Sequence, residues 1–178
     1  MRLYLSCGLT HVPRVDFDQY VSFIEALAAA LLVGAIKDVR YALRDSDPKL
    51  ADEPISDRAR LCYTWDHAMV EWADLVVADA TYPSIGVGIE LQIAAARGTP
   101  IVLCYQRAER HRALGVRYKT PDGSRHDLQI GEGYVSLMAL GLPSLNGVVA
   151  YDSADEALRR VPVAVQSAVE AIRATSQR

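Results

Sequence analysis

Residues Leu75–Glu90 read LVVADATYPSIGVGIE, an apolar run followed by a turn and the start of a helical pattern. The run Leu75–Ala78 is continuous rather than alternating, which is typical of a central parallel strand buried on both faces. The glycine-rich residues 83–88 follow it. The pattern then predicts a helix over about Val87–Arg97, closed by Gly98 just beyond the helix end. This segment therefore predicts a buried strand that leads through a turn into a helix.

The same alternation of strand and helix continues in both directions along the chain. Strands are predicted at Arg2–Ser6, Val39–Leu43, Ile101–Tyr105 and Gly147–Tyr151. One helix is predicted at about Phe17–Val33, and a second runs from an N-cap at Ser56 and Asp57 to about Trp72. A third follows a capping box of Ser153 and Glu156. This order predicts an α/β fold, a doubly wound (Rossmann- or flavodoxin-like) five-stranded parallel sheet flanked by helices. Ligands of such sheets bind beyond the carboxyl ends of the strands. We therefore expect the loops after Ser6, before Asp66 and after Ala78 to border one crevice.

Composition narrows the class of protein. The chain has 178 residues, 51% hydrophobic and 23% charged, which is typical of one globular domain, here residues 1–178. A formal net charge of −3 gives no basic surface for a nucleic acid polymer or an anionic membrane. The apolar run Phe23–Ile36 is too short for a membrane span, and the first residues lack a secretion signal, so we expect a cytoplasmic protein.

Cysteine and histidine positions do not indicate a metal site. The three cysteines are odd in number and have no metal-ligand spacing, which predicts reduced, mostly buried thiols: Cys7, Cys62 and Cys104. The four histidines are scattered, and none has a partner at ligand spacing: His11, His67, His111 and His126. We expect no metal and no other cofactor.

Residues 106–145 interrupt the alternation. Their apolar stretch 134–142 has no clean period, and Pro121–Ser124 is a turn signal. Four arginines fall in this segment, and they either close over an anion or form an exposed solvated face: Arg107, Arg110, Arg112 and Arg117. We interpret the segment as an excursion that covers the site or forms an interface.

Three carboxylates fall near the expected crevice. The spacing puts Asp66 within a helix, Asp79 at a strand end and Glu90 one turn into the next helix. Two carboxylates from different elements are the minimum equipment for glycoside cleavage, where one meets the developing oxocarbenium ion and the other protonates the leaving group. Acidic residues at helix starts are also common as dipole partners or solvated surface, so the pattern alone leaves both readings open.

The residues Tyr4 and Asp66 and the run ADLVVAD…PSIGVGIEL (73–91) resemble the nucleoside 2-deoxyribosyltransferase superfamily, most closely its 2′-deoxynucleoside 5′-monophosphate N-hydrolase branch. The resemblance is dense from about Tyr63 to Tyr105. It implies that Glu90 is the nucleophile at the anomeric carbon, that Tyr4 holds its carboxylate, and that Asp66 is the general acid for the departing base. It also implies a homodimer with shared active sites.

Ser84 separates two branches of this family. Transferases acting on free nucleosides carry an aspartate six residues before the glutamate, where it would repel a phosphate. With Ser84 in that place, the amides of Ser84 and Gly86 at a helix N-terminus form a candidate phosphate cradle, although Ser84 can equally serve as the N-cap. Gly8 belongs to the same predicted site. In the first loop the branch has a serine and an arginine after the glycine. In this chain Thr10 could replace the serine hydroxyl, and His11 or Arg14 could replace the arginine charge.

The sequence therefore predicts an N-glycosyl hydrolase that converts a nucleoside monophosphate to free base and (deoxy)ribose 5-phosphate. A deoxyribosyltransferase that exchanges bases and a non-catalytic nucleotide-binding sensor are the alternatives. The sequence does not specify the base, the preference for ribose or deoxyribose, or the need for the 5′-phosphate.

Overall fold

Five parallel strands form one sheet in the order β2-β1-β3-β4-β7 in the computed structural model, which describes residues 1–176. The strands are β1 (Arg2–Cys7), β2 (Asp38–Arg40), β3 (Leu75–Asp79), β4 (Ile101–Gln106) and β7 (Leu145–Tyr151). All five residues of β3 are buried, as their continuous apolar run predicts. The predicted doubly wound parallel sheet is confirmed.

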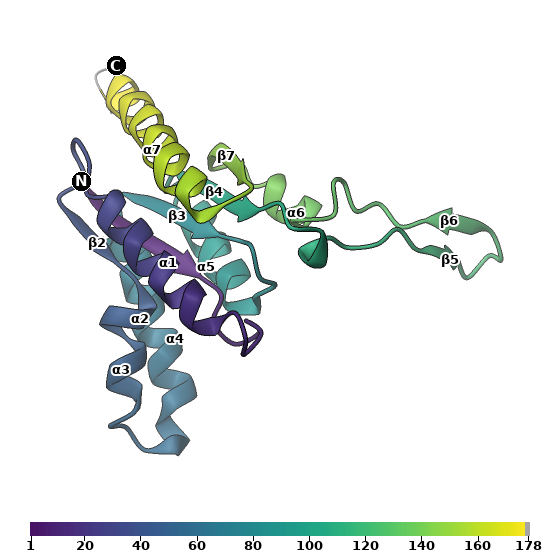
Figure 1. Cartoon of the computed structure of the whole chain (residues 1–178), viewed down its shortest axis with the longest axis horizontal. Helices are drawn as coiled ribbons and strands as arrows, with labels where there is room; N and C mark the ends of the chain where they lie inside the picture. Colours follow the sequence, from purple (N-terminus) through teal and green to yellow (C-terminus); the bar gives the residue numbers. More distant parts are fainter. Residues whose placement is uncertain (177–178) are drawn as a thin grey trace.

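Helices cover both faces of the sheet (Figure 1). One face carries α1 (Phe17–Ala30) and α7 (Ala154–Ser176), and the other carries α4 (Ile55–Trp72) and α5 (Ile85–Ala96). Side chains alternate across a strand, so its odd and even positions enter different cores. Leu3 and Leu5 of β1 pack on the first face, whereas Tyr4 packs on the second. The position of a residue along its strand therefore decides which helices it meets.

The segment between β2 and α4 differs from the prediction. β2 ends at Arg40 rather than Leu43, and the chain then forms two short helices, α2 (Ala42–Asp45) and α3 (Asp47–Leu50). The polar residues Asp45–Pro54, with two prolines, predict a surface loop, and this prediction is wrong over α3. Pro48 is compatible with the first turn of a helix, because the amide hydrogen that it lacks has no helical partner there. Ser46, between the two helices, is buried.

Helix ends were predicted with mixed success. Ser84 is the N-cap of α5, because its Oγ accepts a hydrogen bond from the Val87 amide at 3.2 Å, and Gly98 follows the helix with a φ of 69°. Ser153 Oγ accepts from the Glu156 amide at 3.3 Å, as the capping box predicts, but the Glu156 carboxylate accepts from the Asp152 amide instead of closing the box on Ser153.

The predicted N-cap of α4 is wrong. The helix begins at Ile55 directly after Pro54, and no side chain caps it, so Ser56 and Asp57 lie inside its first turn. Helix α1 ends at Ala30, three residues earlier than predicted, and α7 continues across Pro162.

The excursion after β4 extends away from the sheet (Figure 1). It contains the 3-10 turn η1 (Glu109–His111), the antiparallel strands β5 (Arg117–Lys119) and β6 (Arg125–Asp127), and α6 (Leu137–Leu140). The predicted turn Pro121–Ser124 lies between the two strands, and every residue of both strands is exposed. We call residues 112–133 the arm.

All three cysteines carry free thiols, but only Cys104 is fully buried. The apolar run Phe23–Ile36 includes the second half of α1, whose Ile24 and Leu27 lie in the core. Within residues 1–176, no helix has both the length and the apolar composition that crossing a membrane requires.

Candidate active site

Glu90 lies in the second turn of α5 and faces the end of β1. Ser6, a fully buried residue of β1, donates a hydrogen bond from Oγ to Glu90 Oε2. Tyr4 lies two residues earlier on the same face of the strand, and its phenol also stabilises the charged carboxylate of Glu90. The carboxyl group of Glu90 is therefore held from the sheet by two hydroxyl-bearing side chains.

Burial controls the ionisation of Glu90. It raises the pKa of Glu90 from 4.5 to about 7, because a charged carboxylate is poorly solvated at a buried position. The negative charge of Asp66 raises the same pKa further, whereas the hydrogen bonds from Ser6 and Tyr4 lower it. Glu90 is therefore a carboxyl group that changes charge close to neutral pH.

Asp66 of α4 lies close enough to Glu90 for its charge to act on that group, and it has donors of its own. Ser46 Oγ donates to Asp66 Oδ1 at 2.6 Å, and Cys62 Sγ, one helical turn before Asp66, donates to Oδ2 at 3.4 Å. Burial raises the pKa of Asp66 above its ordinary value, while the two hydrogen bonds oppose that rise. A carboxyl group whose pKa is raised retains a proton more readily than an exposed aspartic acid.

The charges of the two carboxyl groups act on each other and on the Tyr4 phenol. The charge of Asp66 raises the pKa of Glu90, and both charges, after burial, raise the pKa of the Tyr4 phenol well above its ordinary value. The structure thus brings Tyr4, Asp66 and Glu90 to one place. Their chemical roles stay predictions.

Sequence reasoning missed Ser6 and Ser46. The alternation of β1 was a signal for Ser6, because a residue two positions after Tyr4 shares its face. Ser46 had no such signal, since it stands in a polar, proline-containing segment that is typical of an exposed loop.

The third carboxylate, Asp79, points to the opposite face of the sheet. It is fully buried, and it accepts hydrogen bonds from Tyr20 Oη at 2.9 Å and Tyr151 Oη at 2.7 Å. The amide and hydroxyl of Thr81 also donate to it, both at 3.2 Å. Asp79 therefore stabilises the loop that follows β3, and it lies on the other face of the sheet from Glu90.

Two residues of the predicted phosphate site, Gly8 and Ser84, lie in contact. A Cβ atom added to Gly8 would lie 2.8 Å from Ser84 Cβ, so the loops after β1 and β3 are in direct contact. Ser84 and Gly86 stand at the start of α5, where amide groups point toward solvent and favour an anion. Thr10 and His11 are exposed in the first loop, and neither side chain forms a hydrogen bond to another part of residues 1–176.

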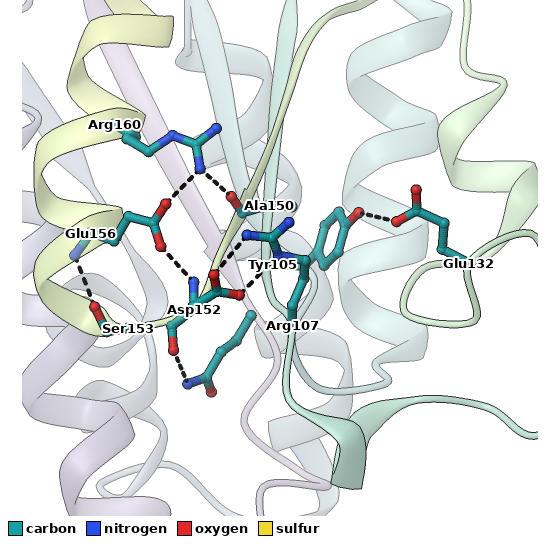
Figure 2. Close-up of polar contacts among 9 residues, drawn as sticks. Tyr105, Arg107, Glu132, Ala150, Asp152, Ser153, Glu156 and Arg160 are labelled. Atoms are coloured by element: carbon teal, nitrogen blue, oxygen red, sulfur yellow. Dashed lines mark hydrogen bonds and ion pairs between the residues drawn. The ribbon is translucent and has the colours of Figure 1, made fainter.

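The arginines after β4 each have an acidic partner. Arg107 pairs with Asp152 at 2.8 Å (Figure 2), and the other pairs are Arg110 with Asp16 at 3.2 Å, Arg112 with Glu109 at 3.7 Å and Arg117 with Asp127 at 2.9 Å. These pairs favour the exposed solvated face over an anion site. Clusters of three or more side chains suited to hold a metal ion are absent from the part of the chain that the structure describes.

Two curated relatives share sequence with this chain. It is 34% identical over 122 residues to the Mus musculus 5-hydroxymethyl-dUMP N-hydrolase, covering 67% of this chain and 66% of that protein. It is 29% identical over 171 residues to a Thermofilum pendens protein that carries the name 2′-deoxynucleoside 5′-phosphate N-hydrolase 1, covering 96% and 99%. The chain thus spans about two thirds of the mouse relative and nearly all of the other. No protein-family model matches the sequence.

Two solved structures share the fold. The Clostridium botulinum CMP N-glycosidase superposes with a TM-score of 0.54 at 17% identity, covering 92% of this chain and 98% of that one. The 2-deoxyribosyltransferase of Bacillus psychrosaccharolyticus superposes with a TM-score of 0.53 at 15% identity, covering 89% and 91%. At these identities the likeness concerns the arrangement of the sheet and its helices.

Proposed function

Because the chain belongs to the nucleoside 2-deoxyribosyltransferase superfamily, on its 2′-deoxynucleoside 5′-monophosphate N-hydrolase branch, we propose that it hydrolyses the N-glycosidic bond of a nucleoside 5′-monophosphate. The products are a free base and (deoxy)ribose 5-phosphate. The observation that carries the proposal is the pair of carboxyl groups, Glu90 and Asp66, which lie close enough for the charge of Asp66 to act on Glu90 and which have separate hydroxyl donors.

The first step uses the two groups in opposite protonation states. The Glu90 carboxylate attacks C1′ of the sugar, and the C1′–N bond breaks with its electron pair moving to the base. Asp66 gives its proton to the departing nitrogen and becomes charged. Protonation matters because the base leaves slowly while it carries developing negative charge. The raised pKa of Asp66 supports its role as the acid.

The second step resolves the glycosyl ester on Glu90. Asp66, now a carboxylate, takes a proton from water as the water oxygen attacks C1′, and the C1′–Oε bond breaks to release Glu90. Both residues then regain their starting protonation states. Tyr4, whose hydroxyl stabilises the charged form of Glu90, would hold the leaving carboxylate in this step.

We propose that the 5′-phosphate binds where the first loop meets the start of α5. The support is the contact of Gly8 with Ser84 and the amide groups of Ser84 and Gly86 at the helix N-terminus. A neutral serine in this place would tolerate a phosphate, whereas an aspartate would repel it. Thr10 and His11 are close in sequence to Gly8 and remain candidates for further phosphate contacts.

We also propose a homodimer with shared active sites. The support in this chain is the arm, whose exposed side chains include Leu114, Val116, Tyr118 and Leu128. A two-stranded hairpin with no packing partner is marginally stable in water, so a surface that covers these side chains would stabilise it.

The test is base release by the purified protein from a panel of ribo- and deoxyribonucleoside 5′-monophosphates and the corresponding nucleosides, followed by chromatography. We expect release from at least one monophosphate and slower release from its nucleoside. Glu90→Gln should reduce the rate by at least about a thousandfold, because the nucleophile is lost. An added second base tests for the transferase, which would yield an exchanged product.

Glu71→Gln is the matched control, since Glu71 is an exposed carboxylate of α4 that pairs with Arg97 away from the crevice. It should retain the wild-type rate. The proposal fails if no monophosphate releases its base, or if Glu90→Gln is as active as the wild type.

A further inference from the structure

Ser6 occupies a rigid position beside the nucleophile. It is 0% exposed and lies inside β1, which pairs with β3 from Leu3 to Cys7, with Ser6 opposite Ala78. Its side chain has a single rotatable bond before the hydroxyl, so the strand itself fixes where the oxygen lies. That hydroxyl donates to Glu90 Oε2.

The groups around Glu90 make its ionisation depend on the Ser6 hydroxyl. The ionisable groups that act on this carboxyl group are Tyr4 and Cys7 from β1 and Asp66 and Cys62 from α4. None of these side chains is cationic, and Asp66 repels a second negative charge. A charged Glu90 therefore depends on hydroxyl donors, and the effect of Ser6 on its ionisation exceeds that of Tyr4.

We infer that Ser6 is a positioning residue for the nucleophile: its hydroxyl holds Oε2 of Glu90 and leaves Oε1 to attack the sugar. This inference rests on the proposed function and extends it, because the family resemblance assigns the holding role to Tyr4 alone. Ser6 does not touch the reacting atoms. It acts by fixing the carboxylate and by favouring its charged form.

The test isolates the ionisation of Glu90. The substrate is a (deoxy)ribose 5-phosphate that carries 4-nitrophenolate as its leaving group, which departs without a proton. A general acid is then unnecessary, so the measurement is made in an Asp66→Asn background. In that background kcat/KM should rise with pH through a single midpoint. Ser6→Ala should move this midpoint up by about one to two pH units, and below the midpoint kcat/KM should fall about ten- to hundredfold.

Two variants separate positioning from a structural role. Ser6→Thr keeps the hydroxyl and should return the midpoint to near its original pH. Ser22→Ala removes an exposed hydroxyl of α1 that donates to Asp18 O, and should change neither midpoint nor rate. Thermal unfolding of each variant checks that it is folded.

An unchanged midpoint in folded Ser6→Ala overturns the inference, even if the rate falls at every pH. If the wild-type protein cleaves neither the aryl substrate nor any nucleotide, the proposed function fails instead. The two failures are thus distinguished by the wild-type measurement.

Discussion

Glu90 and Asp66 have the same functional group in different surroundings. Glu90 is held from the sheet by Ser6, whereas Asp66 is held from the α2–α3 segment by Ser46 and from its own helix by Cys62. Burial raises the pKa of both, and the negative charge of Asp66 raises the pKa of Glu90 further. Two coupled carboxyl groups lose their protons as a pair, so a pH–rate profile of the wild type will report the pair rather than either residue.

The ionisation of Glu90 also predicts how stability depends on pH. Its pKa in the folded protein is about 7, above the 4.5 of the unfolded chain. The folded state therefore binds this proton more tightly. The stabilisation is complete below about pH 4.5 and is lost as the pH rises through 7, which removes at most about 3 kcal/mol from the free energy of unfolding.

Urea unfolding at pH 5 and pH 8 measures this effect. Glu90→Gln carries no titrating proton, so its loss of stability between the two pH values should be smaller than that of the wild type by up to about 3 kcal/mol. Glu71→Gln, at an exposed position, should lose as much free energy of unfolding between the two pH values as the wild type. An equal loss in Glu90→Gln would show that Glu90 is not the residue responsible.

Residue identities were predictable where the pattern is distinctive and unpredictable where it is not. Tyr4, Asp66 and Glu90 were identified through the family resemblance of their surrounding run. Serine is common on surfaces and at caps, so nothing in its identity indicated that Ser6 and Ser46 are buried donors. Their role depends on which carboxyl group accepts from them, and this is known only when β1 is placed against α5 and the α2–α3 segment against α4.

At the scale of elements, the site depends on two loops that meet at the carboxyl edge of the sheet. The loop after β1 begins at Gly8, and the loop after β3 ends at Ser84, the N-cap of α5. The contact between these residues leaves no room for a side chain at Gly8. On the opposite face of the sheet, Asp79 and Thr81 fasten the second loop to Tyr151 of β7.

Gly8→Ala should therefore disturb the proposed phosphate site. The new methyl carbon would lie 2.8 Å from Ser84 Cβ and 3.3 Å from the Tyr82 carbonyl oxygen, so one of the loops must move. We expect KM for the monophosphate to rise at least about tenfold and the free energy of unfolding to fall by about 1–3 kcal/mol. Steady-state kinetics and urea unfolding measure the two effects.

Gly147→Ala is the matched control for this prediction. An added Cβ at Gly147 meets no atom within 4 Å, and the residue lies on the edge strand β7. It should keep the wild-type KM. Wild-type KM and stability in Gly8→Ala would contradict the close contact of the two loops.

The elements that the sequence predicted are those whose buried side chains recur with a regular spacing. The continuous apolar runs of β3 and β4 and the capping signals at Ser84 and Gly98 correspond to observed elements. Residues 106–145 lacked a period because few of their side chains are buried, so burial imposed no spacing on them. The short helix α3 was missed because its polar and proline-containing sequence is equally typical of a loop.

At the scale of the whole molecule, the arm is fixed at its base and unsupported beyond it. Arg107 pairs with Asp152, and Tyr105 Oη donates to Glu132 at 3.4 Å (Figure 2). Tyr134 stacks on Tyr105, with ring centres 5.8 Å apart. The hairpin beyond this base has exposed apolar side chains, and Figure 1 shows it directed away from the sheet. We therefore propose this segment as the surface that contacts a second copy of the chain.

Weakening the arm should therefore separate the proposed dimer. Replacing Leu114 and Tyr118 together by serine removes apolar side chains that are 81% and 47% exposed in one chain, so a monomer should lose little stability. We expect sedimentation to show a dimer for the wild type and a larger monomer fraction for the variant at the same concentration. Base release per chain should fall with the monomer fraction.

Val163→Ser provides the comparison, because Val163 is a 62% exposed apolar residue on α7, remote from the arm in sequence. It should dimerise and react as the wild type does. A wild-type protein that stays monomeric and fully active at micromolar concentration would contradict shared active sites. A dimer that survives in the double-serine variant would instead place the contact elsewhere on the chain, and the exposed Ile85 and Ile89 of α5 would be the next residues to change.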